Sequence, residues 1–246
     1  MADDLSHAKA SADWAISNLD GFQGRLSTWI DNNVEMIRED TNPHGSHFTL
    51  AVIQRAEIPL SFSVEAGAYI NAIRSSLDIL ATALAHRYGV ARSDKAYFPI
   101  AKSAAEFESG SGFKGHEFVM GLPDHCRDIL RSLQPYRGGN DNLVLLHDMD
   151  IERKHKSLLR SVFTVYKFRI NNLKNQNSLN PSKSGFLRFG NKIVLGEISK
   201  SETNPELVVH AYIAFDEAFF PRGKRVIDAL GEFGNLANSI IRRFET

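Results

Sequence analysis

The sequence of 246 residues contains a single cysteine, Cys126. One cysteine excludes an intramolecular disulfide bond and any zinc site built from several cysteines. No stretch approaches the roughly 20 continuous apolar residues of a transmembrane helix. The first residues, MADDLSHAKASADW, also lack the basic and then apolar order of a signal peptide. These absences predict a cytoplasmic protein without a membrane partner.

An excess of charge of one sign is lacking as well. Lys and Arg together number 29, and so do Asp and Glu. The overall charge therefore does not indicate a nucleic-acid partner, and a basic patch has to be sought at individual positions. The nucleophile motif G-x-S-x-G and the phosphate-binding motif G-x-x-x-x-G-K-[ST] are both absent. We expect no cofactor.

In the first two thirds of the chain, apolar residues recur at spacings of three and four, which is typical of helices. This pattern predicts helices over residues 4–31, 62–88, 123–134 and 141–159. A strand is expected over 48–60, paired with 33–40 across a turn that is rich in Asn, Pro and Gly. The glycine-rich stretch 108–115 is expected to be a loop.

From Ser161 the apolar pattern changes to a period of two, which is typical of strands. Strands are predicted in SVFTVYKFRI, GFLRFGNKIVLGEI and LVVHAYIAFDEAF. We therefore predict an α+β fold, a helical bundle with a flanking antiparallel β-sheet. A single domain is expected over 1–246, with a helical core at about 60–160, a β-rich segment at about 161–220 and a C-terminal helix at about 222–244.

Polar side chains form a stripe along the helix predicted over 62–88. At about 100° per residue, the stripe contains Asn71, Ser75, Asp78, Thr82 and His86, with Arg74 at its edge. A solvated helix face usually carries Lys and Glu, which favour helices and stay hydrated at little cost. Neither occurs in this stripe, which therefore predicts a half-buried polar seam.

The helix predicted over 141–159 offers partners for this seam. One side carries His147, Asp150 and Lys154, and the adjacent side carries Asp148, Glu152 and His155. If the helices pack, Arg74 is expected to meet Asp148 or Asp150, and Asp78 to meet Lys154 or His155. Buried charges need such partners, because an unpaired one costs several kcal/mol.

Two interpretations of the seam remain open. The residues are a structural lattice of ion pairs, or they surround a phosphate, a nucleotide or an RNA backbone. In the second interpretation His155 or His86 is the candidate acid–base catalyst. The predicted binding residues are Asn71, Arg74, Asp78, Asp150, Lys154 and His155.

Patterns that bind metals are present only in part. Glu152 and His155 have the E-x-x-H spacing of di-iron helices, but the chain contains no second copy. Zinc or manganese would find suitable ligands in Asp78, His86, Asp148 and His155 if the two helices brought them together. We predict no metal site.

Two further stretches have competing interpretations. Tyr166 and Phe168 alternate with Lys167, Arg169 and Lys174, as in surfaces that stack bases and hold phosphates. The same pattern describes an amphipathic strand with a solvated outer face, which we favour. His125 and Cys126 are neighbours on a predicted helix, where adjacent side chains diverge. The two are therefore not expected to pair, and Cys126 is expected to be a packing residue.

The stretches NAIRSSLDIL, YFPI, LQPY and LLHDMDIERKH resemble a group of uncharacterised bacterial proteins. Proteins of that group carry a helix with Asn followed by R-S-x-L-D, an F-P-I segment, a Q-P-Y turn and a later helix with D-K-H. The resemblance covers roughly residues 60–160. It implies that Asn71, Arg74, Ser75, Asp78, Lys154 and His155 form the site. Because this chain reads Arg-Lys-His, Asp150 becomes the acidic partner.

The helical core also distantly resembles the HEPN superfamily, whose ribonuclease members carry R-x(4–6)-H on a helix. The matching spacing in this chain, from Arg38 to His44, falls at a predicted turn that contains Pro43. This position argues against ribonuclease chemistry of that type.

These observations predict a cytosolic accessory or defence-type protein. It is expected to bind RNA, a nucleotide or a protein partner, including a second copy of itself, through the polar cluster. A HEPN-like or metal-assisted nuclease or hydrolase is the first alternative. A structural interaction module, whose seam is only an ion-pair lattice, is the second.

Overall fold

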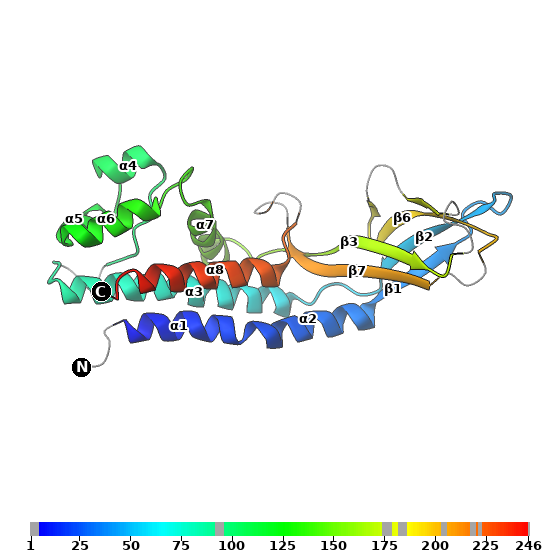
Figure 1. Cartoon of the computed structure of the whole chain (residues 1–246), viewed down its shortest axis with the longest axis horizontal. Coiled ribbons are helices and arrows are strands. Elements are labelled where there is room, and N and C mark those ends of the chain that lie inside the picture. The colour runs from blue at the N-terminus through cyan, green and yellow to red at the C-terminus, as the bar shows by residue number, and fades with distance from the viewer. Residues whose placement is uncertain are drawn as a thin grey trace. The chain divides into compact units, whose positions relative to one another are not determined.

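The fold is α+β, with helices and an antiparallel sheet (Figure 1). The computed structural model describes residues 5–91, 96–173, 179–181, 186–202, 206–216, 220 and 223–245. The chain groups into two compact units. The helical unit comprises Met1–Phe22, Leu60–Arg160 and Phe215–Thr246, and the β-rich unit comprises Gln23–Pro59 and Ser161–Ala214. The expectation of a single domain stays a prediction.

Three long helices frame the helical unit: α1 (Ser6–Ser17), α3 (Leu60–Arg87) and α8 (Val226–Arg242), each in contact with the other two. Helix α3 confirms the helix predicted over 62–88. It ends before Gly89, whose φ of 64° lies in the left-handed region that suits a helix C-terminus. Its buried side includes the apolar residues Ile70, Ile73, Leu77, Leu80 and Leu84.

The first helix is interrupted, whereas the sequence predicts one helix over 4–31. Helix α1 ends just before Asn18, and α2 (Leu19–Asn33) follows. The Asn18 side chain donates to the carbonyl of Trp14 at 2.8 Å, and the Tyr69 hydroxyl donates to the carbonyl of Asn18 at 3.0 Å. The first bond satisfies a carbonyl that the end of α1 leaves open, and the carbonyl of Asn18 also accepts from the N–H of Phe22 in α2 at 3.3 Å. Periodicity alone does not reveal such a break.

The helical unit also contains α4 (Ala104–Ser109), α5 (His116–Gly121), α6 (Asp124–Leu133) and α7 (Asp141–His155). Helices α6 and α7 confirm the helices predicted over 123–134 and 141–159, although α7 ends four residues early. Helices α4 and α5 are not predicted by the sequence. Ser103 caps α4 by accepting a hydrogen bond from the N–H of Glu106 at 3.2 Å. Helix α4 has only six residues, too few for apolar residues to recur visibly at helical spacing.

The β-rich unit contains a five-stranded sheet and the two-stranded pair β3–β7. The five-stranded sheet has the order β1-β2-β6-β4, and β5 also pairs with β6. Its strands are β1 (Val34–Glu39), β2 (His47–Gln54), β4 (Leu179–Pro181), β5 (Leu187–Phe189) and β6 (Lys192–Ser199), and the pair comprises β3 (Ser161–Asn171) and β7 (Glu206–Phe215). The predicted pairing of β1 with β2 is confirmed, although β2 ends at Gln54, six residues before the predicted end at residue 60. One predicted strand over 185–198 is instead the hairpin β5–β6, which turns at Gly190 with a φ of 60°.

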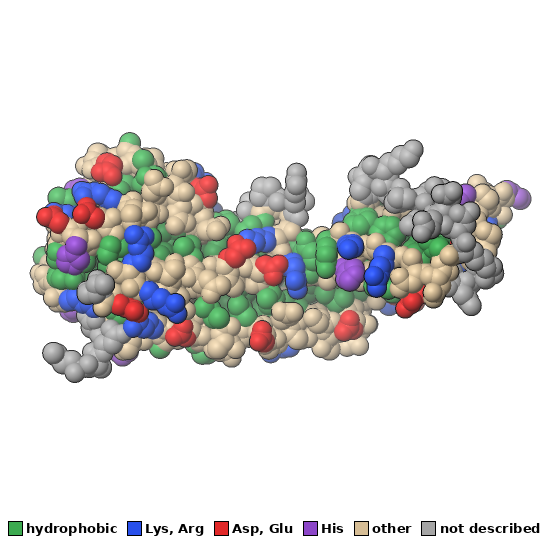
Figure 2. Space-filling model, viewed as in Figure 1, with side chains coloured by type: hydrophobic (Ala, Val, Ile, Leu, Met, Phe, Trp, Pro, Cys, Tyr) green, Lys and Arg blue, Asp and Glu red, His purple; other side chains and the backbone are tan. Residues whose placement is uncertain are grey.

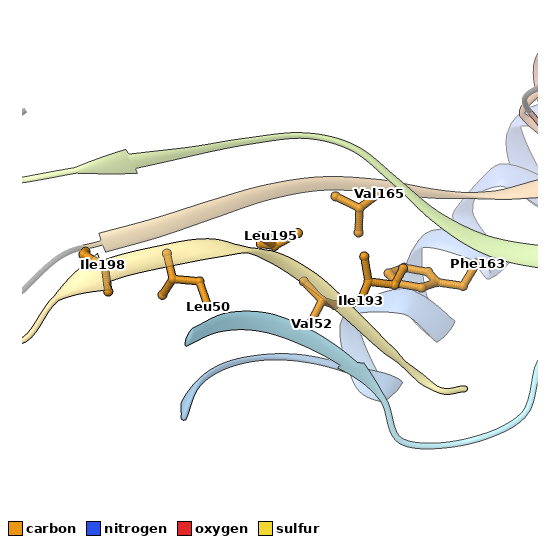
Figure 3. Close-up of a cluster of buried hydrophobic side chains, with 7 residues drawn as sticks. All are labelled: Leu50, Val52, Phe163, Val165, Ile193, Leu195 and Ile198. Carbon is orange, nitrogen blue, oxygen red and sulfur yellow. The ribbon is translucent and has the colours of Figure 1, made fainter. Parts of the chain in front are cut away.

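The β-rich unit has its own apolar core (Figure 3). Strands β2, β3 and β6 supply the buried side chains Leu50, Val52, Phe163, Val165, Ile193, Leu195 and Ile198. Side chains alternate between the two faces of a strand. The pair β3–β7 therefore has one face against this core and one face turned away from it.

The distribution of charged side chains on the surface agrees with the equal numbers of basic and acidic residues in the sequence. Charged side chains of both signs are scattered over the helical unit on the face seen in Figure 2. Within the described part of the chain, no helix combines the length and the apolar character needed to cross a membrane.

Candidate functional site

Helices α3 and α7 pack against each other, as the polar seam predicts. One contact between them lies at Gly67 of α3, where a Cβ would lie 2.9 Å from Cδ of Arg153 on α7. Real side chains almost never come so close, so the absent side chain of Gly67 makes room for Arg153. The two helices thereby bring their polar residues within reach of one another.

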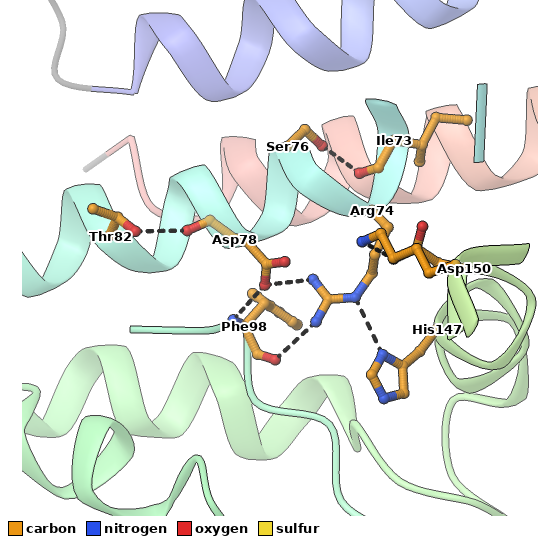
Figure 4. A network of polar contacts seen from close by, with 9 residues as sticks. Ile73, Arg74, Ser76, Asp78, Thr82, Phe98, His147 and Asp150 are labelled. Atoms are coloured by element: carbon orange, nitrogen blue, oxygen red, sulfur yellow. Dashed lines mark hydrogen bonds and ion pairs between the residues drawn. The ribbon is translucent and has the colours of Figure 1, made fainter. Parts of the chain in front are cut away.

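Arg74 lies at the centre of a polar network (Figure 4), and only 4% of its surface is exposed. Its Nη1 donates to Oδ1 of Asp78 at 2.6 Å, and its Nη2 donates to the carbonyl of Phe98 at 3.3 Å. Its Nε donates to Nδ1 of His147 at 3.4 Å. The N–H of Phe98 donates to the same Asp78 oxygen at 3.0 Å. The network joins α3, the segment at Phe98 and α7, and it gives a buried cation the partners that it needs.

His147 is held neutral by its surroundings. Burial lowers the pKa of His147 below its ordinary value, and the positive charge of Arg74 lowers it further. The carboxylates of Asp148, Asp78 and Asp150 act in the opposite direction but do not prevail. A neutral imidazole is required here, because Nδ1 can accept the hydrogen bond from Arg74 only while it carries no proton.

Asp150 is the second buried charge of the seam, with 4% of its surface exposed. It pairs with Arg153, whose Nε lies 3.3 Å from Oδ1, and with Lys154 through Oδ2. Both partners lie one turn further along α7, where side chains three and four residues apart are neighbours. The pair therefore assembles within one helix.

The polar stripe of α3 opens into a cavity of about 750 Å³ in the helical unit. This volume lies within the range of roughly 300–1,000 Å³ that is usual for small-molecule sites. The polar lining comprises Ser75, Asp78, Thr82, His86 and Arg87 of α3, His7 of α1 and Tyr97, and the apolar lining comprises Ile79, Ala83 and Ala96. The stripe is thus the wall of a cavity as well as the side of a seam.

Asp78 belongs to both the network and the cavity. Its Oδ1 accepts hydrogen bonds from Arg74 and from Phe98, which fix the orientation of the carboxylate. Its Oδ2 takes part in no hydrogen bond with another described residue, and the side chain is 32% exposed. Asp78 therefore presents one fixed acceptor oxygen to the cavity.

The sequence left open which side of α7 faces Arg74. In the structure it is the side that carries His147. Asp148 instead bonds Arg137 at 2.9 Å. His155 is exposed and, like the half-buried Asn71, takes part in none of the network's hydrogen bonds. The partner of Asp78 is Arg74 on its own helix, rather than the expected Lys154 or His155.

The sequence does not predict four of the contributors to the site. The sequence places His147 on the seam but not among the site residues. Its position one turn before Asp150, on the same side of the helix, is the feature that indicates a role in the site. The backbone of Phe98 and the side chain of Tyr97 come from the YFPI stretch, where Pro99 keeps the chain extended. The local sequence does not indicate that His7 lines the cavity, because only the packing of α1 on α3 brings it there.

The arrangement does not form a metal centre. Among the described residues, no group of three or more His, Cys, Asp and Glu side chains is placed to hold a metal ion. Asp78, His86, Asp148 and His155 therefore do not converge. Arg38 lies on strand β1 and His44 in the turn after it, so the spacing considered for HEPN-type ribonucleases falls outside any helix.

His125 and Cys126 differ from expectation. The sequence predicts that they do not pair, but Cys126 Sγ lies 3.3 Å from Nε2 of His125, which also lies 3.2 Å from the Tyr88 hydroxyl. The His125 ring thus lies between the Cys126 thiol and the Tyr88 hydroxyl. Burial raises the pKa of the Cys126 thiol, and Cys126 is 1% exposed, so this thiol is not activated as a nucleophile.

The residues from Gly110 to Gly115 have the G-x-G-x-x-G spacing of dinucleotide-binding loops. Such loops follow a strand and open a long helix. This stretch instead lies between α4 and the six-residue helix α5. Its glycines serve the turn, since Gly110 and Gly112 have φ values of 72° and 75°.

Comparison with known proteins does not place the chain in a family. No family model, no curated protein and no solved structure matches it.

Proposed function

We propose that the protein binds a nucleotide in the α3 cavity. The observation that carries this proposal is the position of Asp78, whose carboxylate is fixed by Arg74 and Phe98 at the wall of a cavity of about 750 Å³. A site of this kind is rigid before the ligand arrives, so little binding free energy is lost in ordering it.

The cavity lining matches the parts of a nucleotide. Tyr97 is 62% exposed and offers a ring on which a base can stack. Asp78 accepts hydrogen bonds from the base or the sugar, and Ser75 and Thr82 supply hydroxyl groups beside it. Arg87, together with His86 and His7, provides cationic or hydrogen-bonding groups for a phosphate.

Isothermal titration calorimetry with AMP, GMP, CMP and UMP tests the proposal. We expect saturable binding of at least one of them, and inorganic phosphate alone to bind more weakly. Tyr97→Ala should lower the affinity by about fivefold or more, the value of one stacked base. His86→Gln should lower affinity for the nucleotide more than for the nucleoside, because it removes a group that faces the phosphate.

Two matched variants serve as controls. Phe189→Ala removes an aromatic ring that is 62% exposed, as Tyr97 is, but lies on β5. His44→Gln removes an exposed histidine from the turn after β1. Both should bind nucleotide as the unmodified protein does. Absence of binding at millimolar nucleotide, or equal losses in Phe189→Ala and Tyr97→Ala, would overturn the proposal.

Cleavage of a phosphoester is the second candidate function. His7 and His86 line the same cavity, and two imidazoles beside one phosphate can act as acid and base. Incubation of the protein with a labelled oligoribonucleotide and with nucleotides, followed by chromatography, tests it. Turnover that disappears in His86→Gln but persists in His44→Gln supports catalysis, and unchanged substrates exclude it.

A further inference from the structure

The outer face of the strand pair β3–β7 carries aromatic and basic side chains together. Along β3, Phe163 and Val165 face the core, and after them Phe168 and Ile170 also pack against it. Residues that face the same side of a regular strand are two apart, so the inward side changes from odd to even positions between Val165 and Phe168. Both residues between them, Tyr166 and Lys167, are exposed.

Contacts at the two ends of the pair point to one extra residue in β3 as the cause. At one end the N–H of Asp216 donates to the carbonyl of Arg160 at 3.0 Å, and at the other Asn171 Nδ2 donates to Glu206 at 3.2 Å. The chain takes eleven residue steps between these contacts on β3 and ten on β7. A β-bulge at Tyr166 and Lys167 accounts for the extra step and turns both side chains outward.

A cluster of rings forms around this bulge. The Tyr166 ring lies 5.8 Å from the ring of His210 and 5.4 Å from the ring of Tyr212, both on β7. Tyr166 is 55% exposed, and His210 is exposed as well. Tertiary structure therefore adds two rings from a second strand to the aromatic residue that the sequence of β3 shows alone.

Positive charge accompanies the rings. Lys167 and Arg169 are exposed, and neither forms an ion pair with a described carboxylate. Side chains two residues apart on a strand are about 6.6 Å apart, which is comparable to the spacing of phosphates in an extended nucleic-acid strand. Over this part of the chain, Figure 2 shows a histidine with basic side chains on either side of it. Glu206 lies at the end of the pair, where it bonds Asn171.

We propose that the outer face of β3–β7 binds single-stranded nucleic acid. Tyr166, His210 and Tyr212 stack with bases, and Lys167 and Arg169 contact the phosphates. Exposed rings flanked by cations are the combination that single-stranded nucleic acid requires, since every base has a face to stack and every nucleotide a phosphate. A duplex hides its base faces and would meet only the two cations. This surface lies in the β-rich unit and is independent of the α3 cavity.

Fluorescence anisotropy with a labelled oligouridylate of about 12 nucleotides tests the proposal on the full chain. We expect saturable binding that weakens as salt rises. Tyr166→Ala should lower the affinity by about 5- to 160-fold, the range for one stacked base. The double variant Lys167→Ala/Arg169→Ala should weaken binding and make the slope of log affinity against log salt less negative by about 1.4, as expected for two lost phosphate contacts.

Controls come from the same unit. Phe189→Ala removes another exposed ring, and Arg55→Ala removes an exposed cation that pairs with Glu35. Both should bind the oligonucleotide normally, and circular dichroism should show that all variants are folded. Equal binding by Tyr166→Ala and the unmodified protein overturns the proposal, as does absence of binding at low salt. Tighter binding of a duplex than of the single strand also overturns it, because stacking would then play no part.

Discussion

Nη1 of Arg74 donates to Oδ1 of Asp78 at 2.6 Å, one turn further along α3. In isolated helices, pairs with the cation on the N-terminal side are the weaker arrangement. This pair depends on its tertiary partners instead, because Phe98 bonds both side chains and His147 accepts from Nε. The pair is therefore part of the packing of α3 and a support for the cavity wall.

The first prediction concerns the loss of this cation. Arg74→Met should lower the free energy of unfolding by about 3 kcal/mol, since it leaves the carboxylate of Asp78 without its cation. Urea denaturation measures the effect. Arg131→Met is the matched control, because Arg131 pairs with Asp128 where both side chains are about half or more exposed. It should cost less than about 1 kcal/mol. Equal losses in the two variants would contradict a structural role for Arg74.

The second prediction concerns the two cations on Asp150. Arg153→Met or Lys154→Met alone should cost about 1 kcal/mol or less, because Asp150 keeps one partner in each. Together they leave a buried carboxylate unpaired, and the loss should reach about 3 kcal/mol. In a double-mutant cycle by urea denaturation, the loss of stability in the double variant should therefore exceed the sum of the two single losses by about 1 kcal/mol or more. Lys156→Met, which breaks the exposed pair with Glu152, should change stability little.

Local pattern was sufficient to predict some parts of this architecture. The spacing of apolar residues predicted α3, α7 and α8, and the short polar residues of α3 predicted a seam with α7. The local sequence could not predict contacts between segments that are far apart along the chain. Nothing in the sequence near Asp78 shows that the N–H of Phe98 bonds it, and nothing near Ser75 shows that His7 lies across a cavity.

The choice between two sides of α7 was also beyond the sequence. His147 and Asp148 are adjacent and equally polar, and only the approach of α3 decides which one meets Arg74. The irregularity in β3 could not be predicted from the sequence either. Period-two alternation predicted the strand, but the change of its inward side between Val165 and Phe168 becomes visible only in the packing of β3 against the core.

The third prediction compares two glycines on α8. At Gly234 a Cβ would lie 2.6 Å from Cγ1 of Ile16 on α1, whereas at Gly231 its nearest neighbour would be Leu19 at 3.8 Å. Gly231→Ala should leave stability unchanged or raise it by up to about 1 kcal/mol, the helix propensity of alanine over glycine. Gly234→Ala should lower stability by about 1–3 kcal/mol through overpacking. Thermal denaturation compares them, and a stabilised Gly234→Ala variant would show that α1 and α8 are not closely packed.

The fourth prediction is a loss of stability in acid that depends on His147. Burial, with the charge of Arg74, lowers the pKa of His147 in the folded protein. The unfolded chain therefore takes up a proton first as the pH falls through about 6.5, the ordinary histidine value. Stability from this site is fully present above that pH and declines below it, until the folded protein also binds the proton.

His147→Gln should remove this part of the acid sensitivity, because glutamine can still accept from Arg74 and does not titrate. Urea denaturation at several pH values between about 5 and 8 measures the difference between the two proteins. His155→Gln is the control, since His155 is exposed on the same helix. If the stability difference between His147→Gln and the unmodified protein is the same at every pH, protonation of His147 is not linked to folding. A difference that shifts in favour of His147→Gln only below about pH 6.5 establishes that the folded protein disfavours the protonated imidazole of His147.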